Sequence, residues 1–328
     1  MKAVVISRPG GPEVLEIREV AQPTPAPDQV LIRVRASALN RADLLQRQGH
    51  YPAPFGSPQE IPGMDFAGEI VAIGSLAQLW KPGHRVFGIA GGGAYAEYLV
   101  AHERAIAQIP QRLNWSEAAA VPEAFITAQD ALWRQAELRP GEVVMIHAVG
   151  SGVGLAALQL ANALGAESFG TSRTPDKIEK AKKHGLTNGI AVSDPDKLPI
   201  EFKKAANRRD ADVVLDLVGG AYLNASLQLL ASRGRVICIG TVAGTKAEID
   251  LRHLLSRRII IRGTVLRARP VEEKIAATQA FARELCPLFE RGRLHPVIDS
   301  EFDLHDVAAA HRRMESNETF GKIVLKIS

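Results

Sequence analysis

A glycine-rich turn between an apolar segment and a run of small residues is the part of this sequence best suited to chemistry. Residues 143–154 read VVMIHAVGSGVG and continue into LAALQLANALGA. A short apolar strand that enters glycines and then a helix is a common way for a chain to approach a phosphate, because free N–H groups at a helix N-terminus bind anions. The segment therefore predicts a dinucleotide site.

The turn departs from the usual G-x-G-x-x-G spelling of dinucleotide sites. The three glycine positions fall at Val149, Ser151 and Gly154, so two of them are not glycine. We expect Gly150 and Gly152 to supply the backbone freedom for the tight turn and the close approach to a pyrophosphate. Packing alone can also demand such glycines, but a turn after the first strand of an alternating domain favours cofactor binding. The predicted cofactor contacts here are Gly150, Ser151, Gly152, Val153 and Gly154.

The end of the next expected strand indicates NADPH as the cofactor. NAD sites usually carry an Asp or Glu about 20 residues after the glycines, where it accepts from the ribose hydroxyls. Here that place reads GTSRTPDK, with Thr171, Ser172 and Arg173 at the strand end and Lys177 in the following helix. Hydroxyls and cations suit a 2′-phosphate, which a carboxylate would repel. The alternative is that the two cations are only solvated, with Asp176 between them.

The elements that must position these residues fall into two parts. Up to about residue 115 the chain reads as short strands and turns, whereas from about residue 117 strands and helices alternate. The strands VVMIH, ESFGT, DVVLDL and RVICIG are mainly apolar and do not alternate, which is typical of a parallel sheet covered by helices on both faces. The fold class is therefore α/β, with a doubly wound sheet, and the late strand GKIVLKI is expected to return to the first part.

Composition excludes several other classes of protein. The chain has 328 residues, 46% hydrophobic and 23% charged, and its net charge of +4 is dispersed, so no nucleic-acid partner is expected. No apolar run approaches the roughly 18 residues of a membrane span, and the N-terminal segment lacks the pattern of a signal peptide. We therefore expect no membrane partner and a cytoplasmic location. Cys238 and Cys286 are isolated and are expected to be inert thiols.

Three segments in order give the sequence a family resemblance: ASALNRADLLQRQGHYPAP, HAVGSGVG and AAAVPEAFITAQDAL. Together they make it similar to the medium-chain dehydrogenase/reductase superfamily. Within it, the chain most resembles the zinc-free, zeta-crystallin-like NADPH:quinone oxidoreductases, in particular the p53-inducible type. The resemblance implies a GroES-like, mainly-β catalytic domain of residues 1–118 and 267–328 and a Rossmann NADP-binding domain of residues 119–266. It also implies a homodimer formed through the edge of the Rossmann sheet.

The resemblance also predicts that no metal is bound. Zinc-holding members of the superfamily have their catalytic ligands at positions that here are Asn40, Met64 and Glu123. An amide and a thioether are poor zinc ligands, and a single carboxylate cannot hold the ion alone. Ala42 stands where the alcohol-proton relay of these relatives has Ser or Thr. Metal-assisted alcohol oxidation is therefore not expected.

Without a metal, the hydride acceptor has to be electrophilic itself, as a quinone or an α,β-unsaturated carbonyl is. The protein then aligns the reactants and donates hydrogen bonds to the developing oxyanion. The resemblance implies Asn40 and Tyr51 as these donors and places Thr127 near the nicotinamide, so Asn40 and Thr127 also count as cofactor contacts. Each has a structural alternative: Asn40 as a helix cap, Tyr51 as a half-exposed turn aromatic, and Thr127 as a helix residue bonded to its own backbone.

One position departs from the pattern of the relatives. Many of them carry an Asn-Tyr pair whose tyrosine packs by the 2′-phosphate, and Val192 stands in its place here. The NADPH preference is then weaker unless Arg173, where close relatives often have a small residue, takes over the contact. The remaining predicted cofactor contacts are Val218, Gly219, Gly240, Thr241, Leu266 and Arg267.

These observations predict a zinc-independent, NADPH-dependent quinone oxidoreductase with a small-molecule substrate. One alternative is an NADPH-dependent reductase of enones or enals at the same site, because both reactions deliver hydride to a conjugated carbonyl. Another is an NADPH-binding protein without turnover, against which the presence of Asn40, Tyr51 and Thr127 beside the glycine turn argues.

Overall fold

The computed structural model describes residues 1–327, which form two compact units. Unit 1 contains Met1–Ile126 and the chain from Leu266 onward, and unit 2 is Thr127–Val265. The first boundary lies after the one expected at residue 118, because helix α2 (Trp115–Ala119) packs on the strands of unit 1. The backbone N–H of Glu123 also donates to Asp65 of that unit, at 2.7 Å.

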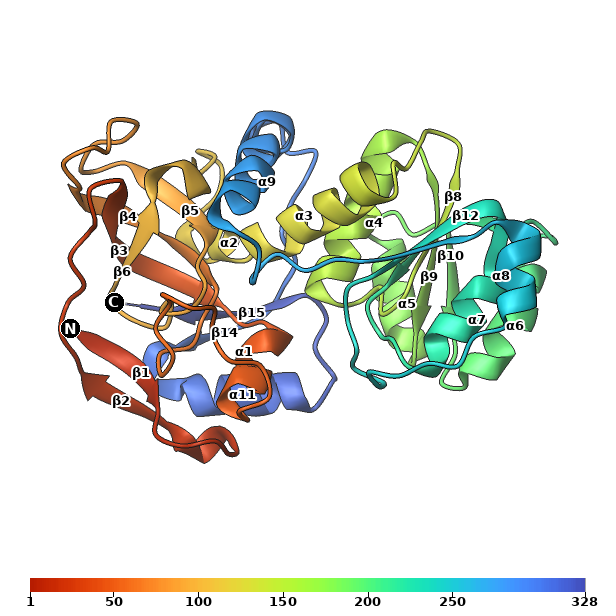
Figure 1. Ribbon diagram of the computed structural model, residues 1–328, viewed down its shortest axis with the longest axis horizontal. Coiled ribbons are helices and arrows are strands. Elements are labelled where there is room, and N and C mark those ends of the chain that lie inside the picture. Colours follow the sequence, from red (N-terminus) through yellow and green to blue (C-terminus); the bar gives the residue numbers. More distant parts are fainter. Residues whose placement is uncertain (328) are drawn as a thin grey trace. The chain divides into compact units, whose positions relative to one another are not determined.

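Unit 1 is built on a seven-stranded sheet in the order β14-β15-β3-β4-β5-β7, with β6 also paired to β3, and on a separate antiparallel pair of β1 and β2. The strands are β1 (Lys2–Ile6), β2 (Leu15–Glu19), β3 (Gln29–Ala38), β4 (Asp65–Ile73), β5 (Arg85–Ile89), β6 (Tyr98–His102), β7 (Ile106–Gln108), β14 (Ile298–Asp303) and β15 (Lys322–Lys326). β15 runs antiparallel to β3 and parallel to β14, so segments from both ends of the chain share one sheet (Figure 1). The predicted return of GKIVLKI to the first part is confirmed.

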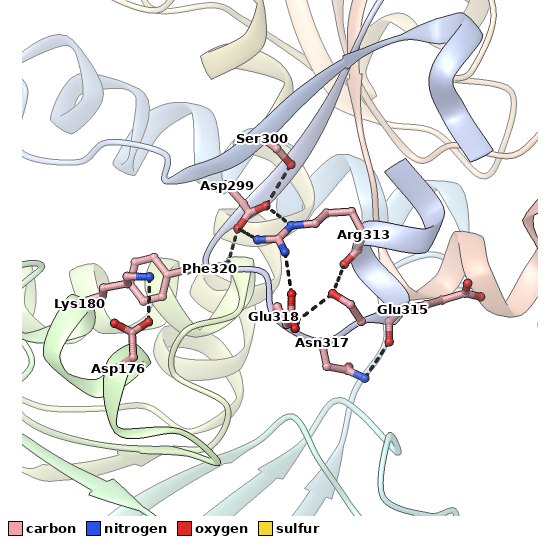
Figure 2. Close-up of polar contacts among 10 residues, drawn as sticks. Asp176, Lys180, Asp299, Ser300, Arg313, Glu315, Asn317, Glu318 and Phe320 are labelled. Atoms are coloured by element: carbon pink, nitrogen blue, oxygen red, sulfur yellow. Dashed lines mark hydrogen bonds and ion pairs between the residues drawn. The ribbon is translucent and has the colours of Figure 1, made fainter. Parts of the chain in front are cut away.

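Short helices surround this sheet. They are α1 (Arg41–Arg47), α2, α3 (Pro122–Gln129), which crosses into unit 2, α9 (Val271–Glu284), α10 (Cys286–Glu290) and α11 (Val307–Glu315), with 3₁₀ turns at Pro12–Val14, Glu103–Ala105 and Leu304–Asp306. A bidentate ion pair joins α11 to β14: the guanidinium of Arg313 donates to both oxygens of Asp299 at 3.0 and 3.1 Å (Figure 2). The same carboxylate accepts from the backbone N–H of Phe320 at 2.9 Å, which positions the turn into β15.

Unit 2 is a doubly wound domain, as predicted. Its six-stranded parallel sheet has the order β10-β9-β8-β11-β12-β13, which is the Rossmann order 3-2-1-4-5-6. The strands are β8 (Val143–Ile146), β9 (Glu167–Ser172), β10 (Asn188–Ala191), β11 (Ala211–Asp216), β12 (Leu230–Cys238) and β13 (Ile260–Gly263). The helical segments are α4 (Gly152–Leu164), α5 (Pro175–Lys182), α6 (Leu198–Ala205), α7 (Ala221–Leu229) and α8 (Leu251–Arg257), a π-helical turn at Asp130–Gln135 and a 3₁₀ turn at Pro195–Lys197. Helices α4 and α5 cover one face of the sheet, and α6, α7 and α8 cover the other (Figure 1).

The glycine turn sets the start of α4 through local chemistry. The hydroxyl of Ser151 accepts from the backbone N–H of Gly154 at 3.1 Å and caps the helix. A Cβ at Gly154 would lie 2.6 Å from the carbonyl oxygen of Ala148, so only glycine allows this close approach of helix and turn. The helix ends at Gly165, whose φ of 82° is the left-handed conformation that favours glycine.

None of the helices within residues 1–327 has both the length and the apolar character needed to cross a membrane.

Candidate active site and dinucleotide site

The turn after β8 differs from expectation in where its backbone strain lies. The left-handed residue is Ala148, with a φ of 48°, and not a glycine. Gly152 is the first residue of α4 and therefore has a helical backbone, so the expectation that glycine φ freedom moves to Gly150 and Gly152 is wrong. Gly152 instead matters because it has no side chain. The N–H groups of Gly152 and Val153 have no acceptor within the helix and point out of its N-terminus, and no side chain of Gly152 covers them.

A buried histidine connects this turn to the end of β9 and to helix α7. His147 is fully buried, and its Nδ1 and Nε2 lie 3.1 Å from the hydroxyl of Thr171 and 2.8 Å from that of Ser226. Burial lowers the pKa of His147, although the charge of Asp216 opposes that shift. The Thr171 hydroxyl is thus hydrogen-bonded to the His147 ring, and Thr171 is only 2% exposed. The backbone N–H of Val149 also donates to Thr171, at 3.0 Å.

The predicted phosphate-binding cations lie at the end of β9 and on α5. Arg173 is exposed directly after the buried Ser172, and Lys177 is half-buried on the first turns of α5. Asp176, which lies between these two cations in the sequence, forms an ion pair of 2.8 Å with Lys180 one helical turn later (Figure 2).

A tyrosine that the sequence analysis missed lies near the same strand end. Tyr222, on α7, donates its hydroxyl to the carbonyl oxygen of Val192 at 3.4 Å, and its ring packs edge-on against His147 with centroids 5.4 Å apart. Burial raises the pKa of Tyr222, and the nearby guanidinium of Arg173 opposes this shift. Tyr222 on α7 thus puts an aromatic side chain next to Val192. The sequence signal was a tyrosine two residues after the glycine pair that follows β11.

The loops after β11 and β12 approach each other at the same carboxyl edge of the sheet. The carboxylate of Asp216 accepts from the N–H groups of Val218 and Gly219 at 2.8 and 2.9 Å. Gly219 has a φ of 70°, and a Cβ there would lie 2.8 Å from the carbonyl oxygen of Gly240 and 3.0 Å from the Cα of Thr241. The predicted contacts of unit 2 outside α3 therefore follow four neighbouring parallel strands, at the edge where such sheets bind ligands.

In unit 1, Asn40 occupies the N-cap position of α1, in line with its structural alternative, but its side chain has other partners. The carboxylate of Asp43 accepts from the backbone N–H of Asn40 at 2.8 Å, and Tyr95 donates its hydroxyl to the same oxygen at 3.1 Å. Burial raises the pKa of Asp43 to about 6. Asn40 itself is only 7% exposed.

The side chain of Asn40 belongs to a buried polar cluster with Asp65, Glu123 and Lys322, which we call the lysine cluster. The ammonium of Lys322 donates to Asn40 Oδ1 at 2.7 Å and to Asp65 Oδ2 at 2.8 Å, and lies 3.9 Å from Glu123 Oε2. Asn40 Nδ2 donates to Asp65 Oδ2 at 2.9 Å and to the Ala38 carbonyl at 3.3 Å. Burial opposes the charge of Lys322, yet the three nearby carboxylates leave its pKa raised. The sequence analysis missed Asp65 and Lys322. The available signal was a charged residue in a mainly apolar segment, Asp65 in GMDFAG and Lys322 in GKIVLKI.

The other predicted residues have different surroundings. Arg267 is 3% exposed and donates to the carbonyl oxygen of Gly91 at 2.8 Å and to the side chain of Gln46. Its guanidinium lies over the ring of Tyr51, 5.3 Å from the centroid, and burial lowers its pKa. Among residues 1–327, nothing accepts from or donates to the phenol oxygen of the half-buried Tyr51. Leu266 and Thr127 are 8% and 6% exposed, the latter on α3.

Comparison with known proteins gives the class that this fold and these strand-end loops define. Residues 26–111 match the family model of the alcohol dehydrogenase GroES-like domain, and residues 191–325 match that of the zinc-binding dehydrogenase. The chain belongs to the medium-chain dehydrogenase/reductase superfamily of nicotinamide-dependent oxidoreductases, and it fits the zeta-crystallin-like quinone oxidoreductase group.

Individual relatives agree over the full length. A quinone oxidoreductase of Pseudomonas aeruginosa is 36% identical, covering 99% of both chains. The solved quinone oxidoreductase of Pseudomonas syringae has a TM-score of 0.89 with 30% identity over 99% of both chains. The CurK enoyl reductase has a TM-score of 0.88 with 27% identity over 100% of this chain and 99% of that one.

The description of one matching family names zinc, and the residues here do not fit that ion. The resemblance puts Asn40, Met64 and Glu123 at the positions of the ligands, and the ammonium of Lys322 contacts the first of these and pairs with the third. A cation held between those side chains repels a second one. Within residues 1–327 there is also no group of three His, Cys, Asp or Glu residues that could hold a metal.

Proposed function

We propose that this protein is a zinc-independent NADPH:quinone oxidoreductase. The observation that carries the proposal is the lysine cluster, in which an ammonium lies among the residues at the zinc-ligand positions. A reductase without a Lewis-acid metal requires an acceptor that is already electrophilic, and the relatives named quinone oxidoreductases act on such a class by name.

The residues of unit 2 are suited to hold the dinucleotide. The N–H groups of Gly152 and Val153 would face the pyrophosphate at the start of α4, with the helix dipole adding to the attraction. Arg173, Lys177 and the hydroxyl of Ser172 would recognise a 2′-phosphate, which distinguishes NADPH from NADH. Bound NADPH supplies the hydride.

The residues of unit 1 are suited to the acceptor. Tyr51 has a phenol whose proton has no acceptor among the described residues, so it can donate to an oxygen of the substrate. Asn40 has a weaker bond of 3.3 Å to Ala38, so this N–H is the one that can donate to the oxygen on which negative charge develops. Solvent then completes the protonation. Thr127 is proposed to lie by the nicotinamide.

A steady-state assay tests this function. NADPH oxidation is measured with a panel of quinones and conjugated enals, with and without a strong chelator, and zinc is measured by elemental analysis. We expect turnover of quinones, no effect of the chelator and no stoichiometric zinc. One tightly held zinc per chain, or activity that the chelator abolishes, would overturn the proposal of zinc independence.

A second candidate is a reductase of α,β-unsaturated carbonyl compounds, which the likeness to the CurK enoyl reductase favours. The same panel separates the two, because kcat/KM for enals or enones that exceeds the values for quinones would assign the protein to this second class. Binding of NADPH without turnover of any acceptor would instead indicate a non-catalytic NADPH-binding protein.

Two further properties are proposals. The resemblance implies a homodimer through an edge of the Rossmann sheet. The two edge strands here are β10 and β13, and we propose β13 because its Ile260 and Ile261 are exposed. A cytoplasmic location remains a prediction from the sequence.

A further inference from the structure

The ammonium of Lys322 in the lysine cluster has no role in the reaction proposed above. Lys322 is 5% exposed and Asp65 is fully buried, so both charged groups have left water. Buried charges persist only when they are paired and hydrogen-bonded. Asp65 meets this condition fully: one oxygen accepts from the N–H of Glu123 at 2.7 Å, and the other accepts from Lys322 and Asn40.

The ammonium fixes the orientation of the Asn40 amide. Lys322 has only donors, so the atom that faces it at 2.7 Å has to be the carbonyl oxygen of Asn40. The NH₂ group of Asn40 therefore points to Asp65 and Ala38, and a flipped amide would place two donors against each other. A charged donor on the carbonyl oxygen also polarises the amide, which strengthens its N–H groups as donors.

We propose that Lys322 is a positioning residue for the reaction: its ammonium takes the place of the metal ion of zinc-holding relatives and acts through Asn40. It orients and polarises the Asn40 amide, so that the N–H now 3.3 Å from the Ala38 carbonyl can stabilise the oxyanion formed by hydride transfer. This inference rests on the proposed function and adds to it a fixed cation that no metal has to supply.

The alternative is that Lys322 only neutralises Asp65. A paired replacement separates the two roles, because Lys322→Met with Asp65→Asn removes both charges of the 2.8 Å pair at similar volume. If neutralisation is the whole role, this variant keeps the kcat of the parent. If Lys322 acts through Asn40, kcat falls by roughly 10- to 100-fold, as for the loss of residues that support a catalytic group, while the affinity for NADPH is unchanged.

The matched control lies on the same strand. Lys326 pairs with Asp303 at 3.5 Å, and their side chains are 50% and 68% exposed. Lys326→Met with Asp303→Asn also removes one ion pair from β15 and β14, and we expect it to leave kcat unchanged. A second neutral pair, Lys322→Leu with Asp65→Asn, also lacks a donor toward Asn40 and serves if the Met variant does not fold.

A mutant cycle with Asn40→Ala decides the question. Asn40→Ala is combined with whichever neutral pair folds, as judged by urea unfolding and NADPH binding, and kcat for a quinone is measured. We expect Asn40→Ala to lower kcat in the parent and to have a much smaller effect in the neutral-pair background. Equal effects in both backgrounds, or the parent's kcat in the Met variant, would overturn the inference. Absence of quinone turnover in the parent would instead overturn the proposed function, and this inference with it.

Discussion

Cofactor choice depends on individual charges at the end of β9. We expect Arg173→Ala combined with Lys177→Ala to bring the affinity for NADPH close to that for NADH. Each contact to a partly desolvated 2′-phosphate contributes about 1.5–3 kcal/mol. Titration with both cofactors measures the ratio, and Lys182→Ala with Lys183→Ala removes two cations near the other end of α5 as a control. An unchanged ratio in the first variant would mean that Arg173 and Lys177 are only solvated.

Two buried titratable groups near Tyr95 have opposite effects on stability. Burial lowers the pKa of His311 to about 3, so its contribution to folding is complete above pH 6.5 and is lost as the pH falls toward 3. Burial raises the pKa of Asp43 to about 6, so its contribution is complete below its ordinary value of 3.8 and is lost as the pH rises through 6. Between about pH 4 and 6 the two dependences oppose each other.

Replacing Asp43 by Asn leaves the dependence on His311 uncompensated. The free energy of unfolding of Asp43→Asn should therefore rise with pH between 4 and 6 more steeply than that of the parent, by about 1.4 kcal/mol per pH unit. Urea unfolding at pH 4, 5 and 6 measures this slope, with the exposed carboxylate of Glu19 replaced by Gln as the control. Parallel slopes for parent and variant would contradict the prediction.

At the residue scale, the sequence predicts which side chains lie at the end of a strand. It does not predict which side chains from distant segments are in contact in the folded chain. Thr171, Ser172 and Arg173 could be placed because the end of β9 is visible as the end of an apolar run. Asp65 and Lys322 are separated by 257 positions and touch only because β15 joins the sheet that contains β4. No local pattern contains such a contact.

At the scale of the element, the turn between β8 and α4 supports a pair of substitutions with different outcomes. Gly152→Val would put a branched side chain at the helix N-terminus, where a pyrophosphate would meet the N–H groups, so we expect a steep loss of NADPH affinity in a protein that still folds. Cofactor titration and thermal unfolding measure both properties. Normal NADPH affinity in folded Gly152→Val protein would mean that the turn does not hold the cofactor.

Val149→Gly restores a glycine to the usual spelling but should not improve binding. Val149 is fully buried, and a Cβ at Gly170 would lie 2.8 Å from its side chain, so the valine fills the space that Gly170 leaves. Losing it should lower the free energy of unfolding by about 2–4 kcal/mol, from lost burial and added backbone freedom. Tighter NADPH binding without loss of stability would show that valine is not required there.

The elements of unit 2 were predictable because their patterns are local. The apolar strands and the glycine turn before α4 each lie within a few residues of the structure they cause. The φ of Ala148 was not predictable, since nothing in its own type favours the left-handed region and the turn around it imposes that conformation.

At the scale of the whole molecule, the exposed edge strand β13 is the part that the proposed homodimer would use. Its Ile260 and Ile261 are 47% and 37% exposed, and an unpaired edge of this kind invites pairing with a second copy. We expect light scattering to give the mass of a dimer for the parent and of a monomer for the variant with Lys at both positions. Val242→Lys, at an exposed valine outside the strand, should stay dimeric. A monomeric parent, or a dimeric double variant, would contradict a dimer through β13.

The position of β15 inside its sheet has a consequence for synthesis on the ribosome. Unit 2 is one continuous segment, so it can fold as soon as residues 127–265 have emerged, and domains generally fold as units during translation. The first 126 residues have to wait, because the strand that fills the place beside β3 and the ammonium that neutralises Asp65 are both translated after unit 2. We expect nascent chains to pass through a stage in which unit 2 has folded while residues 36–38 of β3, which β6 does not cover, remain an open and aggregation-prone edge until β15 is translated.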